Sequence, residues 1–201
     1  PHKSSRRQRQ MCIRDRFDRV LNQLEQNNHL PIIEAFIDSK TCIVAGSTWA
    51  EDETLLIPYI NGTTTDLKFI IAPHNIDKQR VQKLLKKLGK KACLHSDHDV
   101  DTLREKQVLI IDSIGLLSKV YSYANIAYVG GAMGNTGLHN ILEPAVFGIP
   151  IIIGKNYNKF PDAIEMLKIG GGYSVKNFYD LKKIFEYITK DDKWETLGKI
   201  N

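Results

Sequence analysis

Short apolar runs alternate with amphipathic stretches along the chain from Phe17 onward. The runs are apolar throughout rather than at every second position, which is typical of strands buried on both faces of a sheet. They predict seven strands, at Thr41–Ala45, Lys68–Ala72, Lys91–Leu94, Val108–Ile111, Ile126–Val129, Ile149–Ile153 and Tyr173–Val175.

The stretches between these runs predict helices. In Asp77–Leu88 the residues Val81, Leu84, Leu85 and Leu88 recur at the spacing of one buried helix face. The other predicted helices are Phe17–Phe36 with an interruption near Pro31, Glu51–Ile60, Leu116–Tyr123, His139–Phe147, Pro161–Leu167 and Tyr179–Tyr187. Repeated strand–helix units predict an α/β fold with a Rossmann-like, doubly wound parallel sheet.

In such a sheet, ligands bind beyond the carboxyl ends of the strands. The loops that follow the predicted strands are therefore where we expect the chemistry of this chain. They are Gly46–Ala50, Pro73–Ile76, Asp112–Leu116, Gly130–His139 and Gly154–Phe160.

Composition and charge narrow the class of protein. The 201 residues, 42% of them hydrophobic, fit one soluble globular domain, and no apolar run approaches the roughly 20 residues of a membrane span. Residues 1–16 hold six basic residues and one acidic residue, so the remaining 22 basic and 22 acidic residues balance. We therefore expect residues 1–16 to be a foreign or disordered basic tail, with a phosphate- or membrane-attracted arm as the alternative. The domain at 17–201 has no net charge, so its composition gives no sign of the basic surface that nucleic-acid binding requires.

The cysteines indicate a reducing compartment. Cys42 and Cys93 lie in apolar, strand-like runs, where a buried reduced thiol is the usual finding. Cys12 has no C-x-x-C partner, and three cysteines cannot all pair with one another. This usage suits a cytoplasmic protein.

Four glycines between Gly130 and Gly137 separate a predicted strand from a predicted helix. Glycine permits positive φ and close approach of the backbone to a ligand, and a helix N-terminus attracts anions. The spacing matches neither the dinucleotide fingerprint nor the P-loop. A tight connection and an anion-binding loop both fit this pattern.

Three polar residues follow these glycines. His139, Asn140 and Glu143 have the three- and four-residue spacing that places side chains on one helix face. The Glu143 carboxylate could accept two hydroxyl hydrogen bonds, as a ribose requires. The alternatives are that Glu143 only complements the helix dipole, or that it joins His139 in a metal site, for which no third ligand is evident.

These motifs resemble a known family. Asp112-Ser113-Ile114-Gly115-Leu116-Leu117, Tyr128-Val129-Gly130-Gly131 and His139-Asn140-Ile141-Leu142-Glu143-Pro144-Ala145 occur in the order found in 3-deoxy-D-manno-octulosonic acid (Kdo) transferases of lipopolysaccharide synthesis. Gly46–Glu53 is similar to another segment of that family, and Phe17–Val20 matches the end of its interdomain motif. The resemblance covers about residues 17–190 and is to the C-terminal, donor-binding domain.

The resemblance implies the C-terminal half of a GT-B glycosyltransferase, with CMP-Kdo as the donor, a lipid A precursor as the acceptor and no cofactor or metal. It implies that the backbone of Ile114, Gly115 and Leu116 contacts the cytidine. The ribose and phosphate site would comprise Asn140, Ile141, Leu142 and Glu143.

Other positions carry further expectations from the resemblance. Gly130 and Gly131 would let the donor approach closely, and Ser47, Thr48 and His139 would line the donor or acceptor cleft. Pro73 and His74 stand where many members have P-R-H, so the arginine contact is missing here, and a solvated loop is the alternative role for His74.

The family's first domain, with its catalytic glutamate base and its membrane anchor, has no counterpart in this sequence. We therefore expect no catalytic residue in the chain and, for residues 1–201 alone, a soluble fragment with weak nucleotide binding and no transfer. The full-length enzyme would act at the membrane surface on the cytoplasmic face of the bacterial inner membrane.

Two alternatives remain at this point. A GT-B transferase or epimerase that uses a UDP-sugar would have the same fold, because fold does not dictate function. A non-enzymatic, flavodoxin-like binding module would also show repeated strand–helix units, with Asp112 as its one weak phospho-acceptor candidate.

Overall fold

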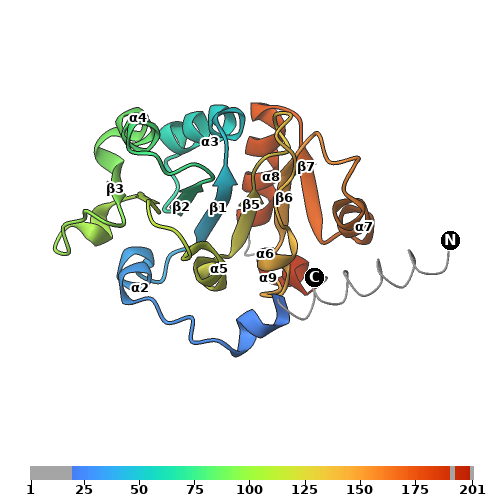
Figure 1. Cartoon of the computed structure of the whole chain (residues 1–201), viewed down its shortest axis with the longest axis horizontal. Coiled ribbons are helices and arrows are strands. Elements are labelled where there is room, and N and C mark those ends of the chain that lie inside the picture. Colours follow the sequence, from blue (N-terminus) through green and yellow to red (C-terminus); the bar gives the residue numbers. More distant parts are fainter. Residues whose placement is uncertain (1–19, 191–192, 200–201) are drawn as a thin grey trace, which may run out of the picture.

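A single sheet of seven parallel strands organises the protein (Figure 1). The structure, a computed structural model, describes residues 20–190 and 193–199, so the predictions for residues 1–19 lie outside it. The strand order is β3-β4-β2-β1-β5-β6-β7. This arrangement confirms the predicted α/β fold with a doubly wound parallel sheet.

All seven predicted strands are present, with small differences at their ends. They are β1 Cys42–Thr48, β2 Lys68–Pro73, β3 Ala92–Leu94, β4 Val108–Ile110, β5 Ile126–Val129, β6 Ile151–Gly154 and β7 Gly172–Val175. Every residue of β2 to β6 is buried, as the unbroken apolar runs predict.

Helices cover both faces of the sheet (Figure 1). They are α2 Pro31–Ile37, α3 Ala50–Gly62, α4 Lys78–Leu88, α5 Leu117–Val120, α6 Leu142–Ala145, α7 Pro161–Ile169, α8 Phe178–Thr189 and α9 Trp194–Gly198. Residues 20–25 are also helical. The short α9 was not predicted, because five residues are too few to show a helical period.

Two hydrophobic cores follow from this layering. Ile43 and Ala45 of β1 face a core shared with α3, α4 and α8, while Cys42 and Val44 face a core shared with α2, α5 and α7. Alternate residues of a strand point to opposite faces, so a strand in the middle of the sheet supplies both cores. Cys42 and Cys93 are buried free thiols, as predicted.

Of the predicted helices, Phe17–Phe36 is interrupted near Pro31 in its described residues, as predicted, whereas His139–Phe147 differs from the structure. The interruption of Phe17–Phe36 lies before Pro31, which is the first residue of α2, a position that suits proline because its missing N–H has no intrahelical partner there. The predicted helix His139–Phe147 is reduced to α6. Gly137 has a φ of 98°, and the His139 amide donates to the Gly130 carbonyl, so the chain folds back before it enters the helix.

The sheet has a topological switch point between β1 and β5, because the chain adds strands on opposite sides of this pair. From β1 the chain continues to β2 on one side, and from β5 it continues to β6 on the other side. The loops that follow these two strands therefore diverge, which makes the carboxyl ends of β1 and β5 the expected position of a ligand. Within residues 20–190 and 193–199, no helix combines the length and apolar character needed to cross a bilayer.

We predict that Gly46→Ala destabilises the protein by roughly 1–3 kcal/mol, the usual cost of overpacking a core. A Cβ at Gly46 would lie 2.0 Å from the hydroxyl oxygen of Tyr121, whose side chain is fully buried. Urea unfolding measures the change. Gly62→Ala is the control, since a Cβ there meets no atom within 4 Å and alanine favours the helix. Equal stability of both variants would contradict the packing argument.

Candidate functional site

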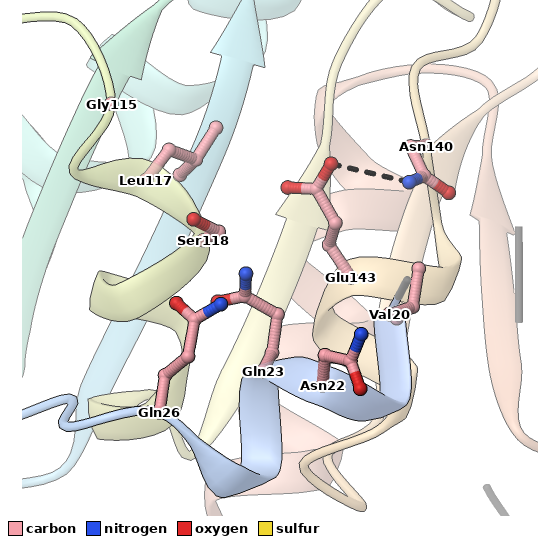
Figure 2. A pocket seen from close by; sticks show the side chains of 9 residues that line it. All are labelled: Val20, Asn22, Gln23, Gln26, Gly115, Leu117, Ser118, Asn140 and Glu143. Carbon is pink, nitrogen blue, oxygen red and sulfur yellow. Dashed lines mark hydrogen bonds between the residues drawn. The ribbon is translucent and has the colours of Figure 1, made fainter. Parts of the chain in front are cut away.

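A cavity of about 780 Å³ lies between the N-terminal ends of α5 and α6, with the helical residues 20–25 along a third side (Figure 2). This volume is within the range of small-molecule sites. The residues that line it are Val20, Asn22, Gln23, Gln26, Gly115, Leu117, Ser118, Asn140 and Glu143. Three residues of the predicted site, Gly115, Asn140 and Glu143, therefore meet in one cavity.

Glu143 and Asn140 form one wall of this cavity. The Asn140 side-chain amide donates to Glu143 Oε1 at 3.2 Å, and its oxygen accepts from the Leu142 backbone N–H at 3.1 Å. These two bonds orient Asn140 at the start of α6. Burial raises the pKa of Glu143, and the hydrogen bond from Asn140 offsets part of that rise. The carboxylate is thus held ready to accept hydrogen bonds from a ligand.

The loop before α5 forms the opposite wall. Gly115 has a φ of 87°, and the position of its absent Cβ is surrounded by open space. A ligand can therefore reach the backbone here. The side chain of Ile114 is 88% exposed, and Leu116 packs against the core. Of the predicted trio Ile114, Gly115 and Leu116, only Gly115 lines the cavity, together with Leu117 and Ser118.

A second group of side chains meets at the switch point of the sheet. The rings of Trp49 and His74 stack with centroids 4.5 Å apart, and those of His74 and His139 stack at 4.4 Å. The indole N–H of Trp49 donates to Nε2 of His139 at 3.0 Å. His139 therefore carries no proton on Nε2, which agrees with the lowering of its pKa by burial and by His74.

This arrangement corrects the predicted relation among His139, Asn140 and Glu143. His139 turns toward Trp49 and His74, whereas Glu143 faces the cavity. His139 lies before α6 and Glu143 lies in its first turn, and α6 has only four residues. The spacing that places residues on one face of a longer helix therefore does not apply to them. Within residues 20–190 and 193–199, no group of three or more His, Cys, Asp or Glu side chains could hold a metal ion.

Asp52 joins the two loops at the switch point. Its buried carboxylate accepts hydrogen bonds from the Trp49 amide at 2.8 Å, the Gly131 amide at 2.9 Å and the Tyr128 hydroxyl at 2.8 Å. Burial raises the pKa of Asp52, and these hydrogen bonds counter the rise. One side chain thus ties the loop after β1 to the loop after β5.

Gly130 and Gly131 allow this close approach of the two loops. A Cβ at Gly130 would lie 2.4 Å from the Ser47 carbonyl oxygen, and one at Gly131 would lie 2.0 Å from the Gly137 carbonyl oxygen. The protein itself fills the space that a side chain would occupy. Close approach of the donor at these two glycines stays a prediction.

Ser47, Thr48, Pro73 and His74 lie at the ends of β1 and β2. Ser47 has a φ of 52°, which is uncommon for a residue other than glycine and marks a constrained turn. The buried Thr48 hydroxyl donates to Glu53, and the Thr48 carbonyl accepts from the His74 amide at 2.9 Å. These contacts fix the two strand ends relative to each other.

Arg80 reaches the same place from α4. Its guanidinium donates to the Thr48 carbonyl at 3.2 Å and to the buried Glu53 carboxylate at 2.8 Å. The chain lacks an arginine between Pro73 and His74, and Arg80 contacts the Thr48 carbonyl that also accepts from the His74 amide. Sequence spacing could not reveal this contact, because it depends on how α4 packs on the sheet.

A smaller cavity of about 350 Å³ adjoins the first. Leu138, His139, Asn140, Ile141, Phe160, Asp162 and Ala163 line it. Asn140 belongs to both cavities. Leu142 is buried in α6 and lines neither of them.

Sequence reasoning missed several residues of the larger cavity. Asn22, Gln23 and Gln26 come from residues 20–26, and Ser118 comes from the first turn of α5. The sequence feature that could have indicated these residues is the cluster of Asn and Gln between Asn22 and Asn28, within the predicted helix Phe17–Phe36.

Several 3-deoxy-D-manno-octulosonic acid transferases are similar to this chain in sequence. A 3-deoxy-D-manno-octulosonic acid transferase of Aquifex aeolicus is 36% identical over 144 residues, which is 69% of this chain and 39% of the relative. One from Chlamydophila psittaci is 32% identical over 65% of this chain and 30% of its own length. The chain is a relative of the 3-deoxy-D-manno-octulosonic acid transferases. The resemblance predicted from the motifs is confirmed.

The chain spans less than half the length of these Kdo transferases. A solved structure, the C-terminal CMP-Kdo binding domain of WaaA from Acinetobacter baumannii, superposes with a TM-score of 0.70. The match covers 86% of this chain and 96% of that domain at 22% identity, so it supports the fold. No protein-family model matches the chain.

We predict that Asp52→Ala lowers the free energy of unfolding by at least about 3 kcal/mol, because the buried amide of Gly131, the amide of Trp49 and the hydroxyl of Tyr128 would lose their acceptor. Urea unfolding measures this loss. Asp97→Ala, at an exposed position, is the matched control and should change stability by no more than about 0.5 kcal/mol. Similar values for the two variants would show that Asp52 does not join the loops.

The Trp49–His139 hydrogen bond should depend on pH. Because the pKa of His139 is lowered in the folded protein, stability is lost as pH falls from about 6.5 through that lowered pKa. Protonation of Nε2 removes the acceptor of the Trp49 indole N–H. The NMR signal of that N–H should therefore shift with a midpoint below about 6.5. The shift should be absent in His139→Gln and unchanged in His29→Gln; a wild-type indole signal constant over this range would contradict the assignment.

Proposed function

We propose that this chain is the donor-binding part of a glycosyltransferase that transfers Kdo from CMP-Kdo to a lipid A precursor in lipopolysaccharide synthesis. The supporting observation is the meeting of Asn140, Glu143 and Gly115 in one cavity, in a chain whose sequence relatives are Kdo transferases. The fold of the CMP-Kdo binding domain of WaaA agrees with this proposal.

Each wall of the cavity would hold a different part of the donor. The Glu143 carboxylate would accept hydrogen bonds from the ribose hydroxyls, and the Asn140 amide keeps that carboxylate in place. The open space at Gly115 would admit the nucleotide to the backbone. These roles need neither a cofactor nor a metal.

In the proposed reaction, an acceptor hydroxyl oxygen forms a bond to the anomeric carbon of Kdo while the bond from that carbon to the CMP phosphate oxygen breaks. The leaving CMP takes the bonding electron pair, and a general base takes the hydroxyl proton. We assign that base, the acceptor site and the contact with the cytoplasmic face of the inner membrane to the rest of the enzyme. The residues of this chain bind and orient the donor.

A UDP-sugar donor is the alternative that the binding test distinguishes. The structure also superposes on HepE of Anabaena, solved with UDP-glucose, with a TM-score of 0.60 at 13% identity over 85% of this chain and 47% of that one. Such a likeness supports the shared fold. Preference for CMP or UMP therefore decides between the donors.

We predict that the chain binds CMP more tightly than UMP and that Glu143→Ala weakens CMP binding about 10- to 100-fold, which corresponds to the loss of hydrogen bonds to a charged acceptor. Isothermal titration calorimetry measures both affinities. Glu165→Ala, at an exposed position of α7, is the control. Tighter binding of UMP would favour a UDP-sugar enzyme, and a folded chain that binds neither nucleotide would contradict the proposed site.

We predict that the Glu143 carboxylate favours CMP binding but lowers the stability of the fold. Burial raises its pKa, so the ionised carboxylate destabilises the fold above that pKa, and the cost is relieved as pH falls through it. Glu143→Gln should therefore melt at a higher temperature than the wild type at pH 7 while it binds CMP less tightly. Calorimetric melting at pH 7, with Glu165→Gln as the control, measures this; a lower melting temperature would show that the carboxylate stabilises the fold.

A further inference from the structure

We propose that Gln23 recognises the nucleobase of the donor, an inference that rests on the function proposed above. Gln23 comes from the helical residues 20–25 and faces the cavity opposite Glu143 (Figure 2). It would be a specificity-determining residue, which neither the motifs nor the spacing of the sequence indicated.

The charge of the lining determines which part of a nucleotide the cavity favours. Among the nine described residues that line it, Glu143 is the only ionisable side chain, and the others are amides, a hydroxyl, apolar side chains and a glycine. An anionic phosphate is disfavoured beside a partly buried carboxylate that has no cation among the lining residues. The cavity therefore suits the neutral, polar half of a nucleotide, which is the base and the ribose.

One wall of the cavity offers mainly hydrogen-bonding groups, as a ribose requires, and the other offers an apolar surface with polar groups near it, as a base requires. Asn140 and Glu143 offer hydrogen-bonding groups to hydroxyls on one side. On the other side, Leu117 offers an apolar surface with Ser118 next to it, and Gln23 projects toward this side from the helical residues 20–25 (Figure 2). A planar heterocycle needs an apolar contact for its face and polar partners for its edge, so the base belongs on the Leu117 side.

The side chain of Gln23 has an acceptor without a hydrogen-bond partner. Its Oε1 atom is buried and has no hydrogen-bond partner, which is rare for a buried side-chain oxygen. The backbone carbonyl of Gln23 accepts from the Asn28 side-chain amide at 2.8 Å, which anchors the end of the helical segment. The exocyclic amine of cytosine is a hydrogen-bond donor. A rotation of the half-buried Gln23 side chain would turn Oε1 into the cavity, where it would accept from that amine and gain the partner that it lacks.

The test compares ligands with and without a base. Gln23→Leu in the full chain should weaken CMP binding roughly tenfold, the effect of losing one hydrogen bond to a buried group, while the affinity for ribose 5-phosphate stays within twofold. Gln23→Glu keeps an acceptor for the amine and should retain CMP binding within a few-fold. Gln82→Leu, on the exposed side of α4, is the matched control. NMR titration measures all four proteins, and thermal melting checks that each is folded.

Each outcome separates the two proposals. If Glu143→Ala weakens CMP binding but Gln23→Leu does not, the nucleotide site stands and the role of Gln23 is overturned. If Gln23→Leu weakens CMP and ribose 5-phosphate equally, Gln23 shapes the cavity and does not recognise the base. If the folded wild type binds neither ligand, the proposed function fails, and the role of Gln23 fails with it.

Discussion

The buried carboxylate of Asp52 holds together the two loops on which the site depends. At the switch point of the sheet, the chain leaves β1 and β5 in opposite directions, so the ladder of backbone hydrogen bonds ends where the loops begin. Beyond that end, Asp52 accepts from the amide of Trp49 on one loop and the amide of Gly131 on the other. Trp49 in turn donates to His139, the neighbour of Asn140, which orients Glu143. Hydrogen bonds therefore link Asp52 to His139 and Asn140 to Glu143, and the peptide bond between His139 and Asn140 joins these two groups from the core to the cavity wall.

This chain of contacts needs backbones that approach each other closely. Glycine at position 130 lets the loop after β5 touch the Ser47 carbonyl, and the same glycine lies beside the Asp52 carboxylate. At Gly46, the absence of a Cβ admits the Tyr121 hydroxyl from the α5 side. Burial of a carboxylate is costly unless it is fully hydrogen-bonded, and only a tightly packed turn places that many donors around it. The glycines and Asp52 thus depend on each other.

The sequence predicted the sheet well and the site in part, for different physical reasons. Strands such as Ile126–Val129 are buried on both faces, so a continuous apolar run identifies them without knowledge of their neighbours. The predicted helix from His139 failed because a hydrogen bond between the His139 amide and the Gly130 carbonyl overrides local helical spacing. Gly115, Asn140 and Glu143 were found through their motifs. Gln23 and Arg80 were not, because their positions depend on contacts between segments far apart in the chain.

The composition of the cavity gives specificity more readily than affinity. An amide both donates and accepts, so Asn140 and Gln23 can match the polar edges of a ribose and a base without any charge. In the described part of the chain, the lining of this cavity contains no cation that could pair with a phosphate, and its single acid would repel one. The nearby His139 has a lowered pKa and accepts a hydrogen bond from Trp49, so its imidazole is neutral as well. The walls of this cavity therefore select a nucleotide by its base and ribose. Favourable interactions with its phosphate have to come from groups outside the cavity.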